Sequence, residues 1–510
     1  RDLIYAQCVY SDGGYILDFD KNKLKCANGE SIDLMLTCKR VAREAMGIPL
    51  STNTLNFSAV CSEEHRVTAG RFDNFLNILH QWQGAKVNDI FPDTIIIPDD
   101  IWNELSEINP KFAPYVELLK QRTQCLASFR RWTSSTGPPG SCGETPSTFR
   151  KWVCSVLQTL WKHRHRFGEE NFALFEAGSG WGPGSYRKTQ ISRLVNVNLD
   201  PWEIPSSSKA SLGETFEHRF SETWDSSLHG DPYDKSQVKH HYSAAAVAVR
   251  FLACLPLACR LNIRNIVLDE NRYAVGRAES HGLGLIPYCQ ENPRLRVERR
   301  ANMWRTVFQS MTGNREPGHT VPYKNQEMEH LYAPSISDSV AVWVLEALEL
   351  ERAGMPAGSF SLVFEGDSIC PQIFQNVVQR DAAWQAAVDL CLERKILPAL
   401  SWGERRSDPR NNIRSRALGE YPGRDNMWYL FENFPQAIRD ITSGNSIVRC
   451  NFDVGKALDP EVLVREHRYW KMDDWKEGWW SHNPESFQPD SGSWLQLLCD
   501  NSYQSDLPLD

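Results

Sequence analysis

The strongest constraint in this sequence is a repeated order of elements, in which an apolar helical stretch is followed by a turn and a short apolar strand. Strands that alternate with helices along a chain usually pair in parallel, because the helix returns the chain to the same end of the sheet. The sequence therefore predicts an α/β fold with a Rossmann-like, largely parallel sheet flanked by helices, together with long loops and additional helical segments. The predicted helix and strand pairs are 32–46 with 54–60, 242–259 with 265–268, 339–353 with 359–364, and 435–441 with 446–450.

Acidic residues stand at the ends of three of these strands. Asp269 and Glu270 end the second strand, Glu365 and Asp367 follow the third, and Asp453 lies just beyond the fourth. The carboxyl ends of parallel strands meet at one edge of the sheet, where α/β proteins bind their ligands. We therefore expect Asp269, Glu365 and Asp367 to help bind a substrate. Carboxylates at strand ends are also often solvated, or cap the next helix, and the sequence leaves that alternative open.

The length and charge of the chain limit its organisation and its partners. With 510 residues it is long enough for roughly two to four domains. We expect an N-terminal α/β segment at 1–132, a linker at 133–147 that is rich in Gly, Pro and Ser, and an α/β body at 148–510. The 64 acidic residues exceed the 56 basic ones, so any nucleic acid must be held by a local basic patch rather than by the overall charge.

Neither a membrane span nor a metal site is indicated. The longest apolar stretch, 244–259, is interrupted by Arg250 and Pro256 and is too short to cross a bilayer. The fourteen cysteines contain no CxxC pair, and HExxH, GxGxxG and Walker A patterns are absent. We therefore expect a cytoplasmic protein with reduced thiols, no metal, no nucleotide cofactor and no membrane partner.

The sharpest acidic cluster is Asp473, Asp474 and Glu477, which lies among four tryptophans. In a helix, spacings of three and four residues put these carboxylates on one face. With Trp475 and Trp479 they could form a pocket for a guanidinium, which pairs with carboxylates and stacks on indole rings. A divalent metal is the competing guest. The spacing of Asp474 and Glu477 is also that of a capping box, in which they would serve only the helix end.

A second cluster is basic, with eight arginines between positions 264 and 305. Its densest part contains Arg294, Arg296, Arg299 and Arg300, which we expect to hold a phosphate backbone. Runs of charge are also typical of solvated helix faces, so this alternative stays open.

Ser368 is a candidate nucleophile. It follows the predicted strand 359–364 in a segment that indicates a strand, a tight glycine turn and then a helix. A serine at such a turn can be exposed beside helix N–H groups that stabilise an oxyanion. No GxSxG pattern is present, and the same serine could instead cap the helix.

Longer stretches of the sequence carry two resemblances. The segments 1–5, 13–19, 36–44 and 49–57 resemble the F-box-like openings of many fungal proteins. The segments 285–294 and 378–384, together with the DDxxE spacing of Asp473, Asp474 and Glu477, resemble the fungal arginine-containing cyclodipeptide synthases. In that family the DDxxE motif is regarded as essential, and the substrates are aminoacyl-tRNAs, one of them arginyl-tRNA.

The second resemblance implies a tRNA-dependent cyclodipeptide synthase, in which an arginyl group from arginyl-tRNA condenses with a second aminoacyl group from another aminoacyl-tRNA. Two successive aminolyses would give a cyclo-Arg-Xaa diketopiperazine. Asp473 and Asp474 would hold the guanidinium, and Glu477 would take the proton of the attacking ammonium. Bacterial cyclodipeptide synthases pass through an acyl-serine, for which Ser368 is the positional candidate. Because the substrates arrive as activated esters, no cofactor is expected.

The alternative is an F-box-like adaptor or scaffold that binds a protein partner without catalysis. The two hypotheses differ in what they require of the DDxxE carboxylates. The synthase needs these groups gathered around a ligand. Carboxylates that point into bulk solvent, or that bind only main-chain amides, favour the adaptor.

Overall fold

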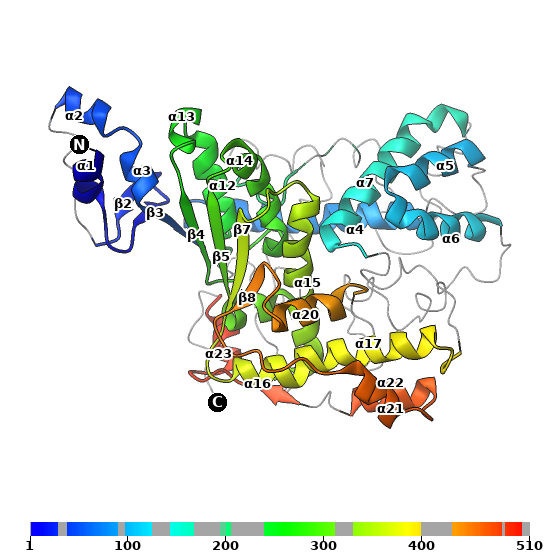
Figure 1. Ribbon diagram of the computed structural model, residues 1–510. Coiled ribbons are helices and arrows are strands. Elements are labelled where there is room, and N and C mark those ends of the chain that lie inside the picture. Colours follow the sequence, from blue (N-terminus) through cyan, green and yellow to red (C-terminus); the bar gives the residue numbers. More distant parts are fainter. Residues whose placement is uncertain are drawn as a thin grey trace, which may run out of the picture.

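The protein is built around a seven-stranded sheet in the order β2-β1-β3-β4-β5-β7-β8 (Figure 1). β1 and β2 pair antiparallel, and all the other neighbours in this sheet pair in parallel. The predicted α/β class, a Rossmann-like and largely parallel sheet with flanking helices, is therefore confirmed. The strands are β1 (Tyr15–Asp18), β2 (Lys23–Cys26), β3 (Thr54–Ser58), β4 (Asn265–Glu270), β5 (Arg296–Asn302), β7 (Phe360–Glu365) and β8 (Val448–Cys450).

This computed structural model describes residues 2–28, 38–89, 97–124, 143–167, 195, 197, 199–205, 239–311, 330–398, 431–481 and 485–501. β3, β4, β7 and β8 match the four predicted strands to within two residues at each end. The sequence pattern did not indicate β1, β2 or β5.

Three of the predicted helices are present as α12 (Ala244–Cys254), α15 (Ala333–Arg352) and α20 (Phe434–Thr442). α12 is shorter than predicted, because Pro256 has no backbone N–H to continue the helix, and the short α13 (Leu257–Arg260) follows it. The predicted helix 32–46 starts outside the described residues, and its described part is α2 (Lys39–Glu44).

The order of the parallel strands determines where the helices lie. β1, β3, β4, β5, β7 and β8 follow one another across the sheet in the same order as along the chain. Right-handed connections that always advance in one direction place their helices on one side of a sheet. α12 and α15 accordingly pack on the same face (Figure 1). The strands alternate as a result: Leu268 and Val297 are buried, whereas Val267 and Glu298 on the opposite face are only half-buried.

A helical unit lies between β3 and β4 in the chain. It comprises α4 (Arg66–Asp89), α5 (Asp99–Ile108), α6 (Ala113–Gln124) and α7 (Pro146–Lys162). It has a core of its own, in which Trp152 stacks on Phe112 with the ring centroids 4.7 Å apart. Residues 125–142, which include most of the predicted linker, lie outside the described residues. β1 and β3 belong to the same sheet as β4, so the main sheet combines strands from both sides of that predicted boundary.

Short elements complete the fold at both ends of the chain. The N-terminal unit consists of α1 (Asp2–Val9), α2, α3 (Ile48–Thr52) and β1 to β3, and it projects at one edge of the sheet (Figure 1). The C-terminal part contains α21 (Pro460–Glu466), α22 (Met472–Trp480) and α23 (Trp494–Cys499), and its strand β9 (Ser486–Phe487) pairs with β6 (Leu331–Tyr332). Of the helices in the described ranges, none combines the length and apolar character needed to cross a membrane.

Candidate functional site

The DDxxE residues lie on the solvent side of α22. Asp473, Asp474 and Glu477 are all exposed. Asp474 Oδ2 accepts a hydrogen bond of 2.8 Å from the backbone N–H of Lys471, the residue that precedes the helix. Asp474 thus serves the amino end of its own helix, but from the third helical position. The capping box consists of Lys471 and Asp474, one turn earlier than the predicted pair of Asp474 and Glu477. The structure does not gather the three carboxylates around an enclosed space.

The tryptophans of this motif face the other way. Trp475 and Trp479 are 2% and 3% exposed, and they belong to an aromatic core between α22 and α17 (Arg380–Glu393). The rings of Trp475 and Trp384 meet edge to face at 5.4 Å. The guanidinium over this core is the chain's own Arg380, which lies 5.6 Å from the Trp384 ring and donates to the backbone oxygen of Trp479. The carboxylates and indoles of the motif therefore do not form the expected pocket.

The four arginines predicted to hold the phosphate backbone of a tRNA, Arg294, Arg296, Arg299 and Arg300, do not all lie on one surface. Arg294 and Arg296 are exposed at the amino end of β5. Arg299 and Arg300 are consecutive strand residues, so their side chains point to opposite faces of the sheet. Arg299 is only 2% exposed, whereas Arg300 is exposed. A buried guanidinium cannot contact a phosphate backbone in this conformation, so the predicted patch is reduced by at least one member.

Arg299 has a different role, as the centre of a buried polar network. Its guanidinium donates to Glu270 Oε1 at 2.8 and 3.0 Å and to the backbone oxygens of Ala278 and Glu279, and it lies 4.6 Å from the ring of Trp343. Glu270 is fully buried and also accepts from the first backbone N–H groups of α12. This network joins β4, β5 and α12 beneath the sheet.

The strand-end prediction is the part of the expected site that the structure brings together. We call the sheet face that carries Val267 and Glu298 the half-open face. On this face, Asp269 is paired with Arg300 in the register of β4 and β5, and Glu365 lies at the end of the next strand, β7. The Nε atom of Arg300 is 2.7 Å from Glu298 Oε1 and 3.9 Å from Glu365 Oε1. We call Asp269, Glu298, Arg300 and Glu365 the strand-end cluster.

Two carboxyls of the strand-end cluster have altered acidity. Burial raises the pKa of Asp269, and the hydrogen bond that Asp269 accepts from Asn271 and the charge of Arg300 only partly oppose this effect. Burial also raises the pKa of Glu365, with a further contribution from the negative charge of Asp269. Groups of this kind exchange protons closer to neutral pH than ordinary carboxyls do.

Asp367 and Ser368 both form hydrogen bonds with Asp490, a residue far away in the sequence. Asp367 Oδ2 accepts from the backbone N–H of Asp490, and Asp490 Oδ2 accepts from the backbone N–H of Ser368 at 2.8 Å. Ser368 is exposed, and among the described residues no histidine is hydrogen-bonded to it. The structure therefore supplies no general base for Ser368 within the described part of the chain.

Sequence reasoning missed a serine–histidine pair. Ser243 Oγ lies 2.6 Å from His281 Nδ1, and His281 Nε2 lies 2.8 Å from the backbone oxygen of Gly276. The pair resembles an activated nucleophile in its geometry. However, Ser243 is fully buried, caps α12 through the N–H of Ala246, and has no access to solvent. Burial lowers the pKa of His281 to about 3, so the imidazole is neutral. We assign this pair to the core.

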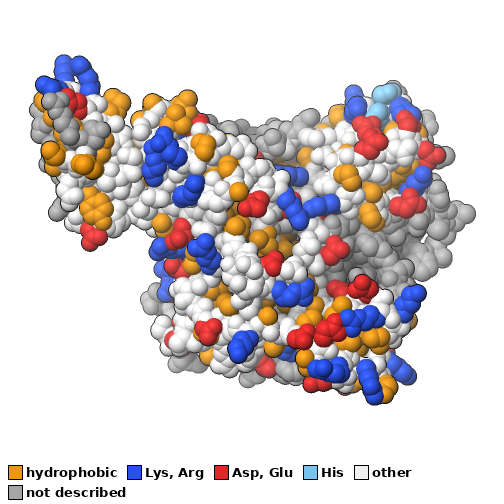
Figure 2. Space-filling model, viewed as in Figure 1, with side chains coloured by type: hydrophobic (Ala, Val, Ile, Leu, Met, Phe, Trp, Pro, Cys, Tyr) orange, Lys and Arg blue, Asp and Glu red, His pale blue; other side chains and the backbone are white. Residues whose placement is uncertain are grey.

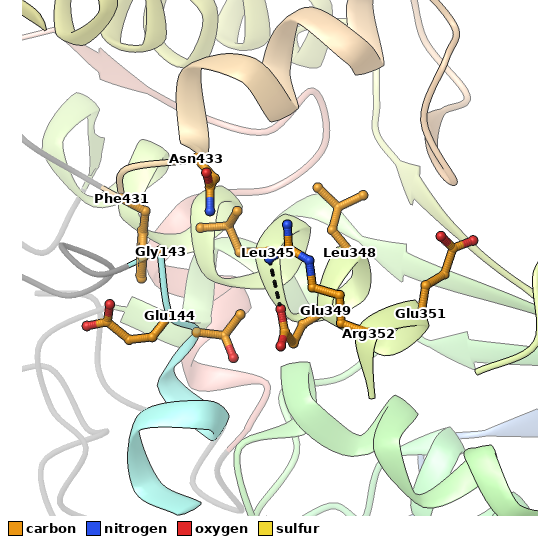
Figure 3. A pocket seen from close by; sticks show the side chains of 10 residues that line it. Gly143, Glu144, Leu345, Leu348, Glu349, Glu351, Arg352, Phe431 and Asn433 are labelled. Carbon is orange, nitrogen blue, oxygen red and sulfur yellow. Dashed lines mark hydrogen bonds and ion pairs between the residues drawn. The ribbon is translucent and has the colours of Figure 1, made fainter. Parts of the chain in front are cut away.

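Sequence reasoning also missed a cavity of about 270 Å³ (Figure 3). It lies where the carboxyl-terminal half of α15 meets two segments that are far away in the sequence, 143–145 and 431–433. Gly143 has φ of +68°, and a Cβ atom there would come within 3.2 Å of the side chains of Asn433 and Glu432. Because three distant segments build this cavity, no local motif could have revealed it.

Comparisons with known proteins add no assignment. No family model, no curated protein and no solved structure matches this chain. Within the described ranges, no group of three His, Cys, Asp or Glu side chains is placed to hold a metal ion.

Proposed function

We propose that this protein is an adaptor that binds a partner protein through its N-terminal unit. The observation behind this proposal is the distribution of exposed apolar side chains. Of the ten large apolar side chains that are exposed in the described residues, five lie within the first 46 positions. They are Leu3, Ile4, Tyr10, Ile16 and Met46, with exposed fractions from 45% to 88%, and we call them the N-terminal apolar surface. Such a concentration on one small unit is typical of protein-binding surfaces.

The charges beside this surface indicate the chemistry of the partner. Tyr5 Oη donates to Glu44 Oε2 at 2.7 Å, which fixes α1 against α2. α2 exposes Lys39, Arg40 and Arg43 next to the apolar side chains of α1. Figure 2 shows basic and apolar side chains together on this projecting unit. A partner segment with apolar contact residues and an acidic rim fits this arrangement.

The DDxxE geometry supports the same proposal, since exposed carboxylates and a helix-capping Asp474 are what the adaptor hypothesis expects. The F-box-like resemblance of the N-terminal segments agrees with the location of the apolar surface.

Replacing Leu3 and Ile4 by aspartate is expected to weaken the partner complex by at least about tenfold, because two exposed apolar contacts become charged groups facing an acidic partner. The matched control replaces Ile396 and Leu458, which are 41% and 40% exposed near α17 and α21, by aspartate. Cross-linking mass spectrometry of the full chain in its native cell measures both variants. Cross-links between the partner and residues 2–46 that persist in the Leu3/Ile4 variant would contradict the proposal. Cross-links between the partner and other parts of the unaltered protein would contradict it as well.

A second candidate function, cyclodipeptide synthesis from aminoacyl-tRNAs, is favoured by one observation, the strand-end cluster. Two carboxyls with raised pKa flank a guanidinium at the edge of the sheet where α/β enzymes bind ligands. In this proposal Asp269 or Glu365 takes the proton from the ammonium of one aminoacyl group as its amine attacks the ester carbonyl of the other. The tRNA hydroxyl leaves, and a second aminolysis closes the diketopiperazine. The partners are arginyl-tRNA and a second aminoacyl-tRNA, and no cofactor takes part.

Under this second candidate, changing Asp269 to Asn and Glu365 to Gln together is expected to lower product formation by about 100-fold or more, the usual contribution of a general base. Asp474→Asn is expected to leave the product unchanged. Mass spectrometry of small molecules from a heterologous host expressing each variant measures both effects. A folded Asp474→Asn variant that makes no product would assign the catalytic role to the DDxxE motif instead of the strand-end cluster. If the unaltered chain makes no product, the synthase proposal fails and only the adaptor proposal remains.

A further inference from the structure

Beyond the adaptor function, we propose that Asp381 and the charged groups around it form a pH-sensitive latch. The latch holds the end of α22 and the start of β9 in place at low pH and loosens them as the pH rises. Asp381 lies in the first turn of α17, directly after the π-helical turn Phe374–Gln379. Such turns are frequent at functional sites. The latch is remote from the N-terminal apolar surface in the fold, so it is tested independently of the adaptor proposal.

Asp381 is buried where the first turn of α17 meets the amino-terminal part of α15 (Figure 1). Its side chain is almost enclosed, with 6% of the residue exposed, and Oδ2 accepts a hydrogen bond of 2.6 Å from Ser337 Oγ. The guanidinium of Arg380 lies 4.0 Å from Asp381 Oδ1, but it donates its hydrogen bond of 2.9 Å to the backbone oxygen of Trp479. A carboxyl group in such a place has lost its water, and this disfavours its charged form.

Two further carboxyl groups act on Asp381 from neighbouring elements. Asp338 belongs to α15 and is also buried. Glu485 directly precedes β9, and its backbone oxygen accepts a hydrogen bond of 3.1 Å from the first N–H of α15. The negative charges of both groups disfavour ionised Asp381. The cluster thus joins α15, α17 and the start of β9, and Arg380 connects it to the end of α22.

The acidity of Asp381 gives the latch its pH range. Burial raises the pKa of Asp381 to about 7, and the charges of Asp338 and Glu485 add to this effect. The hydrogen bond from Ser337 and the charge of Arg380 oppose it. An exposed aspartate has a pKa of about 3.9, so the closed latch keeps a proton that the opened latch has released. The stabilisation from this proton is complete below about pH 4 and is lost as the pH rises to about 7.

Proton loss changes two contacts of the latch. Ionised Asp381 repels Glu485, which weakens the attachment of the start of β9. Ionised Asp381 also attracts Arg380, and this competes with the hydrogen bond that Arg380 donates at the end of α22. Both changes act on the C-terminal elements and not on the strands of the main sheet. We therefore expect a local opening of α22 and β9 rather than unfolding of the whole protein.

Hydrogen–deuterium exchange of the full chain, measured by mass spectrometry between pH 5 and pH 8, tests the latch. Asp381→Asn is an uncharged substitute for the protonated carboxyl group. At each pH the exchange rate of the unaltered protein is divided by that of the variant, which cancels the direct effect of pH on exchange. For peptides that cover α22 and β9, this ratio is expected to rise by at least about tenfold from pH 5 to pH 7 and to change little above pH 7.

Two further variants complete the test. Glu393→Gln, at an exposed position near the other end of α17, is the matched control, and its ratio is expected to stay the same from pH 5 to pH 7. Glu485→Gln removes one repelling charge and is expected to give a smaller rise than Asp381→Asn. Circular dichroism checks that Asp381→Asn folds, and Glu485→Gln carries the test if it does not. A ratio that stays constant from pH 5 to pH 7 would overturn the proposal, and so would an equal rise in peptides from α12 and β4.

Discussion

Arg299→Ala is expected to lower the free energy of unfolding by about 3–5 kcal/mol, because it leaves the carboxylate of Glu270 buried without its counter-charge. The side chains of both residues are almost completely enclosed, at 2% and 0% exposure. The same substitution removes the donors to two backbone oxygens and the contact with Trp343. Chemical denaturation followed by circular dichroism measures the effect, which is a large share of the roughly 5–15 kcal/mol by which folded proteins are usually stable.

Arg300→Ala is the control, one position away on the same strand. Arg300 is 44% exposed and pairs with Glu298 on the half-open face, and exposed pairs of this kind contribute no more than about 1 kcal/mol. A large difference between the two variants would show that the strand orients them oppositely. Equal and small losses would contradict the buried network, and they would restore the hypothesis that the arginines of this segment form one exposed patch.

The contrast between Arg299 and Arg300 shows why the prediction of one basic patch was wrong for Arg299. A run with Arg296, Arg299 and Arg300 has the composition of a basic surface, but β5 contains only Val297 and Ala301 as apolar residues and was therefore not recognised as a strand. Once the segment is a strand, its period of two decides which arginine is buried. Recognising Arg299 as a core residue also required Glu270, which lies 29 positions away.

The fold class was predictable because it depends on the order of helices and strands, which local patterns record. The partial exposure of one sheet face, the half-open face, was not predictable in this way. Val267 and Val363 made β4 and β7 read as continuous apolar strands, which usually have both faces covered. In the structure their neighbours on that face include Asp269, Arg300 and Arg449. Among the described helices, α12 and α15 cover the other face. The order of the strands across the sheet determines which face the helices cover, and no local sequence pattern records that order.

Replacing Trp475 by alanine is expected to lower the free energy of unfolding by about 3–5 kcal/mol, since a large buried ring leaves a cavity that its neighbours cannot fill. Trp475 contacts Trp384 and Trp470 at ring-centroid distances of 5.4 and 5.7 Å. The midpoint of denaturation, followed by tryptophan fluorescence, measures the change. Asp474→Asn, one residue earlier, is expected to cost no more than about 1 kcal/mol, because it only weakens a hydrogen bond at an exposed helix end.

The comparison decides what the DDxxE spacing means in this chain. Met472, Trp475 and Trp479 are spaced as one apolar stripe of a helix, so the acids between them must face away from the core, and this pattern was present in the sequence. If Asp474→Asn proved as damaging to folding as Trp475→Ala, α22 would depend on its cap far more than an exposed helix end should. If it left folding intact but abolished a product, the exposed carboxylates would have to meet their substrate at the surface. A variant that is stable and unchanged in partner binding fits the adaptor, in which α22 is a packed helix with a solvated face.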